Sequence, residues 1–302
     1  MGPATRTLRY FVVDAFTRTP LAGNPVAVFV DADDVPARQM QALARELNLS
    51  ESTFVLRPRR PDSDYRVRIF TPVNELPFAG HPLLGTAIAL ANNTDTGPTL
   101  ALETERGVVP FELERSGGTA VVARMDQPIP TWGPYEHEEF LLRALGVDEP
   151  AVPVAAFRNG PRHVLVGTTI DHLKRVSPDQ RMLAELPDMA AHCFAPSGDG
   201  WGNRMFSPAY GVVEDAATGS VAGPLAIHLG LHGLAAFGEE VTIFQGVEMG
   251  RPSTMHARVT GSAERVERVE VWGAGVQVAE GVFALPAEAP GLLGPARREG
   301  VW

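Results

Sequence analysis

Two ionisable side chains, His81 and Asp215, lie close in the sequence to glycines that are expected to begin helices. His81 follows Gly80, and Asp215 comes four residues before Gly219 and the adjoining Ser220. Backbone N–H groups at a helix N-terminus are unpaired and lie at the positive end of the helix dipole, so each end can bind an anion. Two such ends could hold one small carboxylated molecule beside groups that transfer protons.

Each of these features also has a simpler structural interpretation. Gly80 and Ser220 could merely end loops and cap helices. Glu214 and Asp215 could lie in a solvated turn, and Glu51, just before an apolar strand, could be an exposed residue at a helix end. Because two glycine-led helix ends occur in matching positions, we favour the functional interpretation.

The two glycines each begin a segment that is apolar on every side. Residues 80–90 and residues 219–229 share four identities in eleven positions, namely the opening glycine and then Ala, Ile and Leu. Each segment follows a strand and an acidic loop, and a helix without a polar face is typical of a buried helix. A duplicated fold with one central helix in each half explains the repetition.

Shorter patterns predict the elements around these helices. Residues 9–30 are typical of a pair of strands, and residues 33–47 of a helix with an acidic N-cap and an early proline. Glu51 then lies where this helix gives way to the next strand. Residues 127–134 are rich in proline and are the best candidate for a linker.

Composition excludes several classes of function. The 302-residue chain has 26 basic and 36 acidic side chains, a net charge of −10, which disfavours sequence-independent binding to nucleic acid or anionic membranes. Its one cysteine, Cys193, excludes an internal disulfide, a Cys-rich zinc site and chemistry by two facing thiols. The dinucleotide, P-loop, zincin and serine-hydrolase signatures are missing from the sequence. Cofactor-free proton transfer on a small acid therefore remains.

Targeting and membrane signals are also missing from the sequence. The first ten residues contain no apolar segment of the kind found in secretory signals, and no run of 18 apolar residues occurs. We therefore expect a cytoplasmic protein that binds neither membrane nor nucleic acid.

Several motifs resemble the PhzF family. They are DAF at 14–16, GNPVAV at 23–28, NLSESTFV at 48–55, FTPVNELPFAGHP at 70–82 and EDAATGS at 214–220. Residues 159–163 and 204–211 are similar to the members of the family that act in phenazine biosynthesis. The resemblance runs from about residue 10 to residue 285.

The resemblance implies an α+β protein with the diaminopimelate-epimerase-like fold. In this fold two pseudo-symmetric halves each form a curved β-sheet around a central buried helix, and the active site lies in the cleft between them. We expect residues 1–127 to form the first half, completed by a returning strand near residues 278–286, and residues 128–277 to form the second. Residues 286–302 would form a tail, and the family also implies a homodimer.

The reaction implied is the isomerisation of trans-2,3-dihydro-3-hydroxyanthranilate in phenazine biosynthesis, without metal or organic cofactor. A proton leaves C3 of the substrate and returns to the far end of the diene. By the resemblance, Glu51 is the catalytic carboxylate that carries this proton. His81 and Asp215 match the polar pair that contacts the ring substituents and assists proton movement.

The remaining site residues also follow from the resemblance. Gly80, Gly219 and Ser220 match backbone and hydroxyl donors, and the last two are expected to hold the substrate carboxylate. Epimerases that share this fold use two thiols, as base and acid, which would lie near Ala79 and Thr218. Since neither position is a cysteine, a two-thiol epimerisation is excluded and a single-carboxylate shuttle remains.

Two alternatives stay open at this point. The first is a PhzF-like isomerase or epimerase that acts on another small amino or hydroxy acid. The second, from a different class, is a non-catalytic ligand-binding or scaffold protein. The presence of Glu51, His81 and Asp215 argues against the second, because a protein that only binds needs no group that transfers a proton.

Overall fold

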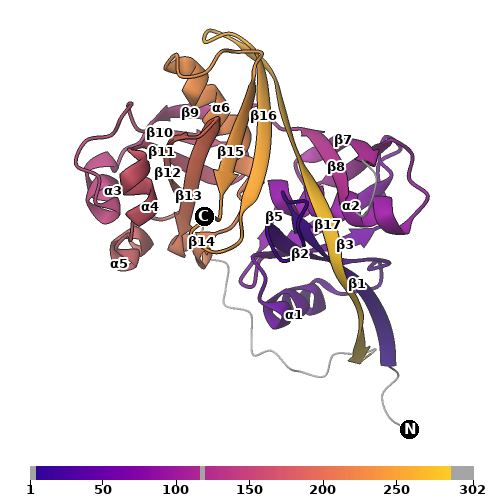
Figure 1. The fold of residues 1–302 in the computed structure, drawn as a ribbon. Helices are drawn as coiled ribbons and strands as arrows, with labels where there is room; N and C mark the ends of the chain where they lie inside the picture. Colours follow the sequence, from indigo (N-terminus) through magenta and orange to yellow (C-terminus); the bar gives the residue numbers. More distant parts are fainter. Residues whose placement is uncertain (1–4, 116–119, 287–302) are drawn as a thin grey trace.

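Two buried helices organise the molecule. The computed structural model describes residues 5–115 and 120–286. Its strands join into one 17-stranded sheet that curves around α2 (Gly80–Asn93) and α6 (Gly219–Leu231) (Figure 1). Both helices are buried along almost their whole length, as their uniformly apolar sequences predict.

Eight strands form a closed circuit around α2 in the first half. In spatial order they are β1 (Thr5–Ala15), β2 (Asn24–Phe29), β3 (Glu51–Leu56), β4 (Tyr65–Phe70), β6 (Thr99–Thr104), β7 (Gly107–Arg115), β8 (Ala120–Asp126) and β17 (Val266–Pro286), which pairs again with β1. The short β5 (Glu75–Leu76) pairs with β4, and α1 (Ala37–Leu47) packs on the outer face of β1, β2 and β3.

The second half repeats this connectivity around α6. Its strands are β9 (Thr131–Pro134), β10 (Ala155–Arg158), β11 (Arg162–Gly167), β12 (Ala190–Ser197), β13 (Gly200–Ser207), β14 (Val212–Asp215), β15 (Glu240–Gln245) and β16 (Ser253–Gly261). In each half the central helix follows a short strand, β5 or β14. In each half a parallel pair, β2 with β3 or β11 with β12, recurs at the same place in the order. The duplication predicted from the two helix sequences is therefore present in the topology.

Smaller helices cover the outside of the second half. They are α3 (Glu138–Leu145), α4 (Ile170–Arg175), α5 (Gln180–Ala184) and the 3-10 turn η1 (Pro208–Tyr210). Leu141, Leu173 and Leu183 from three of these helices pack against buried side chains of β11 and β12. Both faces of this sheet are therefore covered.

The long strand β17 belongs to both halves (Figure 1). Its first part pairs with β16, residues 270–276 pair with β8, and residues 275–286 pair with β1. The returning strand expected near residues 278–286 is thus the end of a longer one. Two glycines of β17 let other side chains approach it closely. A Cβ on Gly275 would lie 2.5 Å from Ile88 Cδ1 of α2, and a Cβ on Gly273 would lie 2.3 Å from Phe16 Cδ1.

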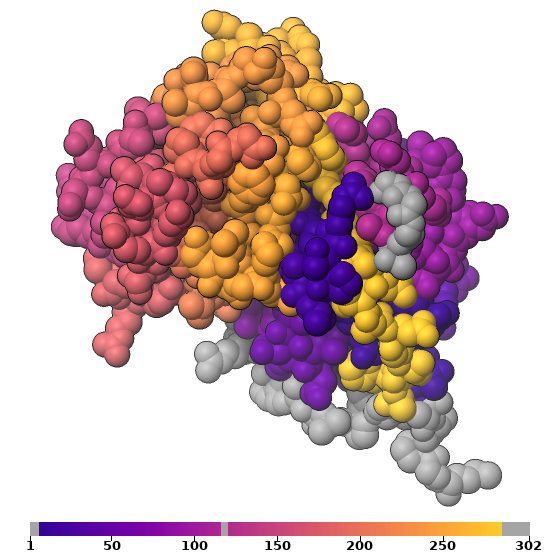
Figure 2. Space-filling view, viewed as in Figure 1, coloured from indigo at the N-terminus to yellow at the C-terminus, as the bar shows by residue number. Residues whose placement is uncertain are grey.

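An ion pair between the buried Asp14 and the partly exposed Arg251 ties the two halves together. The Arg251 Nη2 atom donates to Asp14 Oδ1 at 2.7 Å, and Arg251 Nε donates to the Gly23 carbonyl, also at 2.7 Å. The Gly23 N–H in turn donates to the Pro252 carbonyl at 3.1 Å. In Figure 2 the indigo N-terminal segment packs against the orange part of the second half.

One local prediction was wrong and another was incomplete. The helix α1 has Pro36, not an acidic residue, at its N-cap, and Asp33 Oδ1 instead accepts a hydrogen bond from Arg57 N at 2.9 Å. Residues 127–130 join β8 of the first half to β9 of the second, so the predicted linker lies between the halves, but Gln127 is buried and its amide donates to the Gly219 carbonyl at 2.8 Å. Their prolines disfavour helix, but they do not prevent packing.

Two further expectations concern the C-terminal tail and the membrane. Apart from Pro286, the tail predicted at residues 286–302 lies outside the described residues. Within the described residues, no helix combines the length and apolar character needed to cross a bilayer.

Candidate active site

The N-terminal ends of α2 and α6 meet between the two halves. A Cβ on Gly80 would lie 2.6 Å from Ser220 N, and a Cβ on Gly219 would lie 2.9 Å from His81 N. Only glycine lets two backbones approach this closely. The two predicted anion-binding ends are therefore parts of one site.

The positions expected to correspond to the epimerase thiols are the two N-cap residues, Ala79 and Thr218. Ala79 has no polar side chain, and Thr218 Oγ1 donates to Asp215 Oδ2 at 2.6 Å instead of capping its helix. The N–H groups of both first turns are consequently left without a side-chain acceptor from their own N-cap residues.

Glu51 and His81 face each other inside this site. Glu51 begins β3, His81 is the second residue of α2, and Glu51 Oε2 lies 3.3 Å from His81 Nε2. Their side chains are only 15% and 4% exposed. The two atoms are not aligned as a hydrogen bond, and neither has another partner among the described residues. Both are therefore available to a group on a bound molecule.

Burial sets the charge of both groups. Desolvation raises the pKa of Glu51 well above its ordinary value of 4.5, and the nearby charge of Asp215 raises it further. Desolvation lowers the pKa of His81 to about 4, although Asp215 opposes this shift. His81 is consequently neutral at pH 7, so its contact with Glu51 is not an ion pair.

Asn24 indicates which nitrogen of His81 holds the proton. Its Nδ2 donates to Asp215 Oδ1 at 2.8 Å and to the Ala217 carbonyl at 3.0 Å, which fixes the orientation of the amide. The same Nδ2 lies 3.4 Å from His81 Nδ1. Both hydrogens of this amide are already donated and an amide nitrogen does not accept, so we assign the tautomer that fits the contact, with Nδ1 unprotonated and the hydrogen on Nε2, which faces Glu51.

Asp215 is held by groups from both halves. Asn24 and Thr218 donate to its two carboxylate oxygens, and Ser50 Oγ lies 3.5 Å from Oδ1. Asn24 and Ser50 belong to the first half, whereas Thr218 precedes α6 in the second. Asp215 therefore acts as a fixed hydrogen-bond acceptor beside Glu51 and His81.

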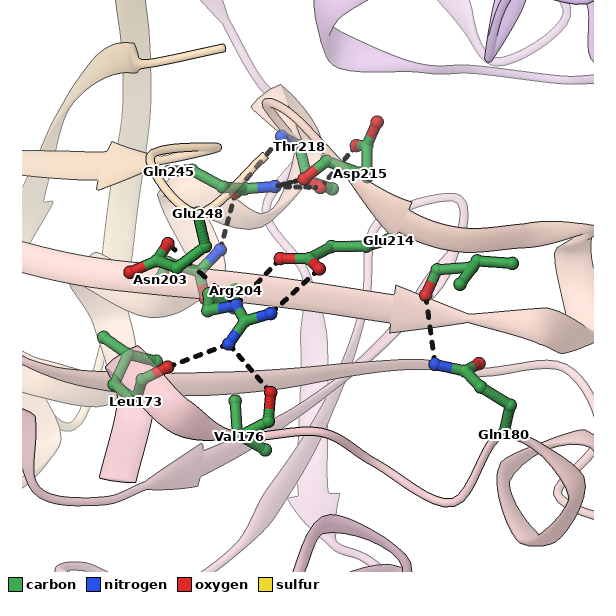
Figure 3. Close-up of polar contacts among 11 residues, drawn as sticks. Leu173, Val176, Gln180, Asn203, Arg204, Glu214, Asp215, Thr218, Gln245 and Glu248 are labelled. Atoms are coloured by element: carbon green, nitrogen blue, oxygen red, sulfur yellow. Dashed lines mark hydrogen bonds and ion pairs between the residues drawn. The ribbon is translucent and has the colours of Figure 1, made fainter. Parts of the chain in front are cut away.

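The neighbouring Glu214 lies outside the site. Glu214 makes two hydrogen bonds with Arg204, at 2.8 and 2.9 Å, while Asp215 points to the opposite side of β14 (Figure 3). Arg204 also donates to the carbonyls of Leu173 and Val176. Successive residues of a strand face opposite sides, so only one of the two acidic residues reaches the helix ends.

A buried polar chain behind Asp215 escaped the sequence analysis. Gln245 Nε2 donates to the Asp215 carbonyl at 2.8 Å and to Thr218 Oγ1 at 3.0 Å, and Gln245 Oε1 accepts from Asn203 Nδ2 at 2.6 Å. Asn203 then lies 3.3 Å from His192 Nδ1. The chain ends at His163, 3.0 Å from His192 Nε2, and both histidines are buried.

The sequence contains a weak signal for this chain. His192 is the clearest case, because it is a polar residue between apolar neighbours in β12, and a buried polar group is usually hydrogen-bonded. His163, at the end of the chain, is likewise buried, although it adjoins the charged Arg162 in the sequence. Asn24 lies in one of the motifs that carried the resemblance, but nothing in the sequence linked it to Asp215.

All six predicted site residues converge at the helix ends. Glu51, His81 and Asp215 supply two carboxylates and a neutral imidazole, and the residues that supply backbone and hydroxyl donors are Gly80, Gly219 and Ser220. Within residues 5–115 and 120–286, no group of three or more His, Cys, Asp or Glu side chains is placed to hold a metal ion. The arrangement suits the binding of a small anion and the transfer of a proton to and from it.

Comparison with known proteins identifies the family. A model of the PhzC-PhzF family, described as phenazine biosynthesis-like protein, matches residues 13–281. The chain belongs to the PhzC-PhzF family. The match includes Glu51, His81, Asp215 and both helix ends, and it confirms the resemblance found in the sequence motifs.

Individual relatives of this PhzC-PhzF protein extend the comparison. A trans-2,3-dihydro-3-hydroxyanthranilate isomerase from Pseudomonas fluorescens is 59% identical over 277 residues, which cover 91% of this chain and 99% of that protein. The crystal structure of a PhzF-family phenazine biosynthesis protein from Bacillus anthracis matches with a TM-score of 0.80 and 25% identity, over 92% of this chain and 99% of that one.

A more distant structure concerns the fold of this PhzC-PhzF protein alone. A hydroxyproline epimerase from Agrobacterium vitis matches with a TM-score of 0.62 and 14% identity, over 93% of both chains. Together with the two central helices, these likenesses confirm the predicted α+β class and the diaminopimelate-epimerase-like fold.

Proposed function

We propose that this protein is a trans-2,3-dihydro-3-hydroxyanthranilate isomerase in which Glu51 carries the proton. The observation that supports this most strongly is the buried contact between Glu51 Oε2 and His81 Nε2, two atoms without another partner among the described residues. The 59% identity to an isomerase of that name, over nearly all of both chains, supports the choice of substrate.

The raised pKa of Glu51 suits a group that both removes and returns a proton. As a carboxylate, Glu51 takes the proton from C3, and the C–H electron pair moves into the diene. As a carboxylic acid, it then delivers the same proton to the far end of the diene, and the resulting enol becomes a ketone. A raised pKa weakens the preference for the carboxylate over the carboxylic acid, so Glu51 suits both transfers better than an exposed Glu does.

His81 and Asp215 keep their positions through both steps. The neutral His81 presents its Nε2–H beside Glu51, where it can donate to a ring substituent or to the Glu51 carboxylate. Asp215 accepts hydrogen bonds from Asn24 and Thr218 and can accept another from a hydroxyl or amino group of the substrate. We assign both residues to substrate orientation and proton movement.

The ends of the two helices supply the binding site for the carboxylate. The protein has a net charge of −10, so long-range attraction does not favour an anionic substrate. Backbone N–H groups at Gly219 and Gly80, with the Ser220 hydroxyl, provide local donors at the positive ends of two helix dipoles. We assign the substrate carboxylate to the Gly219-Ser220 end.

Turnover of the candidate substrate tests this proposal. Purified protein is mixed with trans-2,3-dihydro-3-hydroxyanthranilate, and loss of substrate is followed by absorbance and by NMR. We expect catalytic loss of substrate, with a slower rate when C3 carries deuterium because the C3–H bond breaks. A wild-type protein that binds this substrate without converting it, or that isomerises a different amino or hydroxy acid instead, would refute the proposal.

We propose in addition that the protein is a cytoplasmic homodimer in which residues 1–127 and 128–277 are the two halves of each subunit. Light scattering coupled to gel filtration should give twice the chain mass of 32.4 kDa. A monomer mass across the working concentration range would exclude the dimer. Fractionation of producing cells checks the compartment.

A further inference from the structure

The helix that bears Ser220 contains a proline in its interior. Pro224 follows Ser220 by four residues in α6, where its N–H would normally donate to the Ser220 carbonyl. Proline has no N–H, and its ring also crowds the carbonyl of the residue four positions earlier. The Ser220 carbonyl therefore lacks its helical donor at the end of α6 that faces the site.

The side chain of Asn159 replaces this missing donor. Asn159 Nδ2 donates to the Ser220 carbonyl at 2.8 Å, and the Asn159 side chain is buried. The adjacent Gly219 carbonyl accepts from Gln127 Nε2 at the same distance. Two side-chain amides from outside α6 thus hold two successive carbonyls of its first turn.

The loop that carries Asn159 lies against both halves of the molecule. Asn159 lies in the loop between β10 and β11, followed by Gly160, which has a φ of +154°. A Cβ on Gly160 would lie 3.3 Å from the ring of Phe78, which precedes the N-cap residue of α2. The Asn159 loop therefore contacts the starts of both helices that form the site.

We propose that Asn159 is a positioning residue for the isomerisation. Its amide supplies the hydrogen bond that Pro224 cannot, and by holding the Ser220 carbonyl it keeps the first turn of α6, with the Gly219 N–H and the Ser220 hydroxyl, in the orientation needed to bind the substrate carboxylate. This role rests on the proposed function, which places the carboxylate at Gly219-Ser220. Loss of the hydrogen bond should weaken carboxylate binding without altering the proton transfer at Glu51.

Restoring a backbone donor by mutation gives a direct test. Asn159→Ala should raise KM for trans-2,3-dihydro-3-hydroxyanthranilate about tenfold and leave the pH dependence of kcat unchanged. Pro224→Ala restores a backbone N–H four residues after Ser220, so the double variant Asn159→Ala/Pro224→Ala should return to within about threefold of the wild-type KM. The second readout is the Kd of 2-aminobenzoate, an inert carboxylate with an adjacent amine, measured by calorimetry.

The Pro224→Ala background keeps the test decisive if Asn159→Ala alone does not fold. There, removal of Asn159 should change neither KM nor the Kd of 2-aminobenzoate, because Ser220 has its own helical donor. A loss of affinity in that background would show that Asn159 contacts the substrate directly and would overturn the proposal, as would an Asn159→Ala variant with wild-type KM. Absence of turnover in the wild type would instead refute the proposed function, and the 2-aminobenzoate Kd values would still decide the role of Asn159.

Discussion

Glu51 Oε2 and His81 Nε2 lie 3.3 Å apart in a buried site, and neither atom has another partner among the described residues. Glu51 is the first residue of a strand and His81 the second residue of a helix, so the contact depends on the folded chain and not on a local turn. Burial raises the pKa of the carboxyl group and lowers that of the imidazole. The pair is thus a carboxyl group that can gain or lose a proton beside an imidazole that stays neutral.

The burial of Glu51 should lower the stability of the protein at neutral and alkaline pH. A carboxyl group whose pKa is raised by folding contributes stability fully below its unfolded value of about 4.5, and this contribution is lost as pH rises through the raised pKa. Glu51→Gln should therefore unfold at a higher denaturant concentration than wild type at pH 8, with the difference disappearing near pH 4. Glu46→Gln, at an exposed position in α1, is the matched control and should show no such trend.

His81 should have the opposite effect on acid stability. Its pKa falls from 6.5 to about 4 on folding. Neutral His81 therefore contributes its full share of the stability of the folded protein above pH 6.5, and this contribution is lost as pH falls toward 4. Between these limits wild type should lose about 3 kcal/mol more than His81→Asn. Urea unfolding at half-unit pH intervals measures the difference. If the stabilities of the two proteins changed with pH in parallel, the pKa of His81 would not be lowered by folding.

Removal of Arg251 should destabilise the contact between the halves. The Asp14 side chain is 2% exposed and its pKa is raised by burial, although the Leu21 N–H and Arg251 both favour the charged form. Arg251→Leu should cost about 2 kcal/mol at pH 8 and less at pH 4, where Asp14 gains a proton more readily. Arg9→Ala, which breaks an exposed ion pair with Glu280, should cost below about 1 kcal/mol at either pH. Equal losses for the two variants would contradict this account.

The buried amide of Gln245 should matter for both stability and catalysis. Gln245→Leu leaves the Asp215 carbonyl, Thr218 and Asn203 without their shared partner, which should cost about 2 kcal/mol in the free energy of unfolding and lower kcat/KM about tenfold. Gln277→Leu removes the same side chain from a half-exposed position in β17, where it accepts from Asn93, and should change neither quantity appreciably. Steady-state kinetics and chemical unfolding of both variants provide the comparison.

The fold was predictable because its main signal is repeated. Two apolar segments, each led by a glycine, indicated two buried helices in matching settings, and α2 and α6 occupy corresponding places in the topology. The predicted acidic cap of α1 was wrong because Asp33 forms its contacts with Arg57, a residue of a later segment. A local pattern cannot distinguish a capping carboxylate from one engaged by a distant residue.

The site was only partly predictable from the sequence. The motifs placed Glu51, His81 and Asp215, and the structure brings them together. The supporting amides of Asn24, Gln245 and Asn159 escaped notice, because their partners lie 30 to 191 residues away or are backbone carbonyls of another element. Hydrogen bonds of this kind are set by three-dimensional packing and leave no spacing pattern in the sequence.

The most direct test of the central claim is the rate of conversion of trans-2,3-dihydro-3-hydroxyanthranilate by Glu51→Gln, measured beside its affinity for 2-aminobenzoate. A buried amide of the same shape cannot accept and return the C3 proton, so kcat should fall by about 10²- to 10⁴-fold while the Kd of 2-aminobenzoate stays within a few-fold of wild type. Turnover close to the wild-type rate would contradict the assignment of Glu51 as the group that carries the proton.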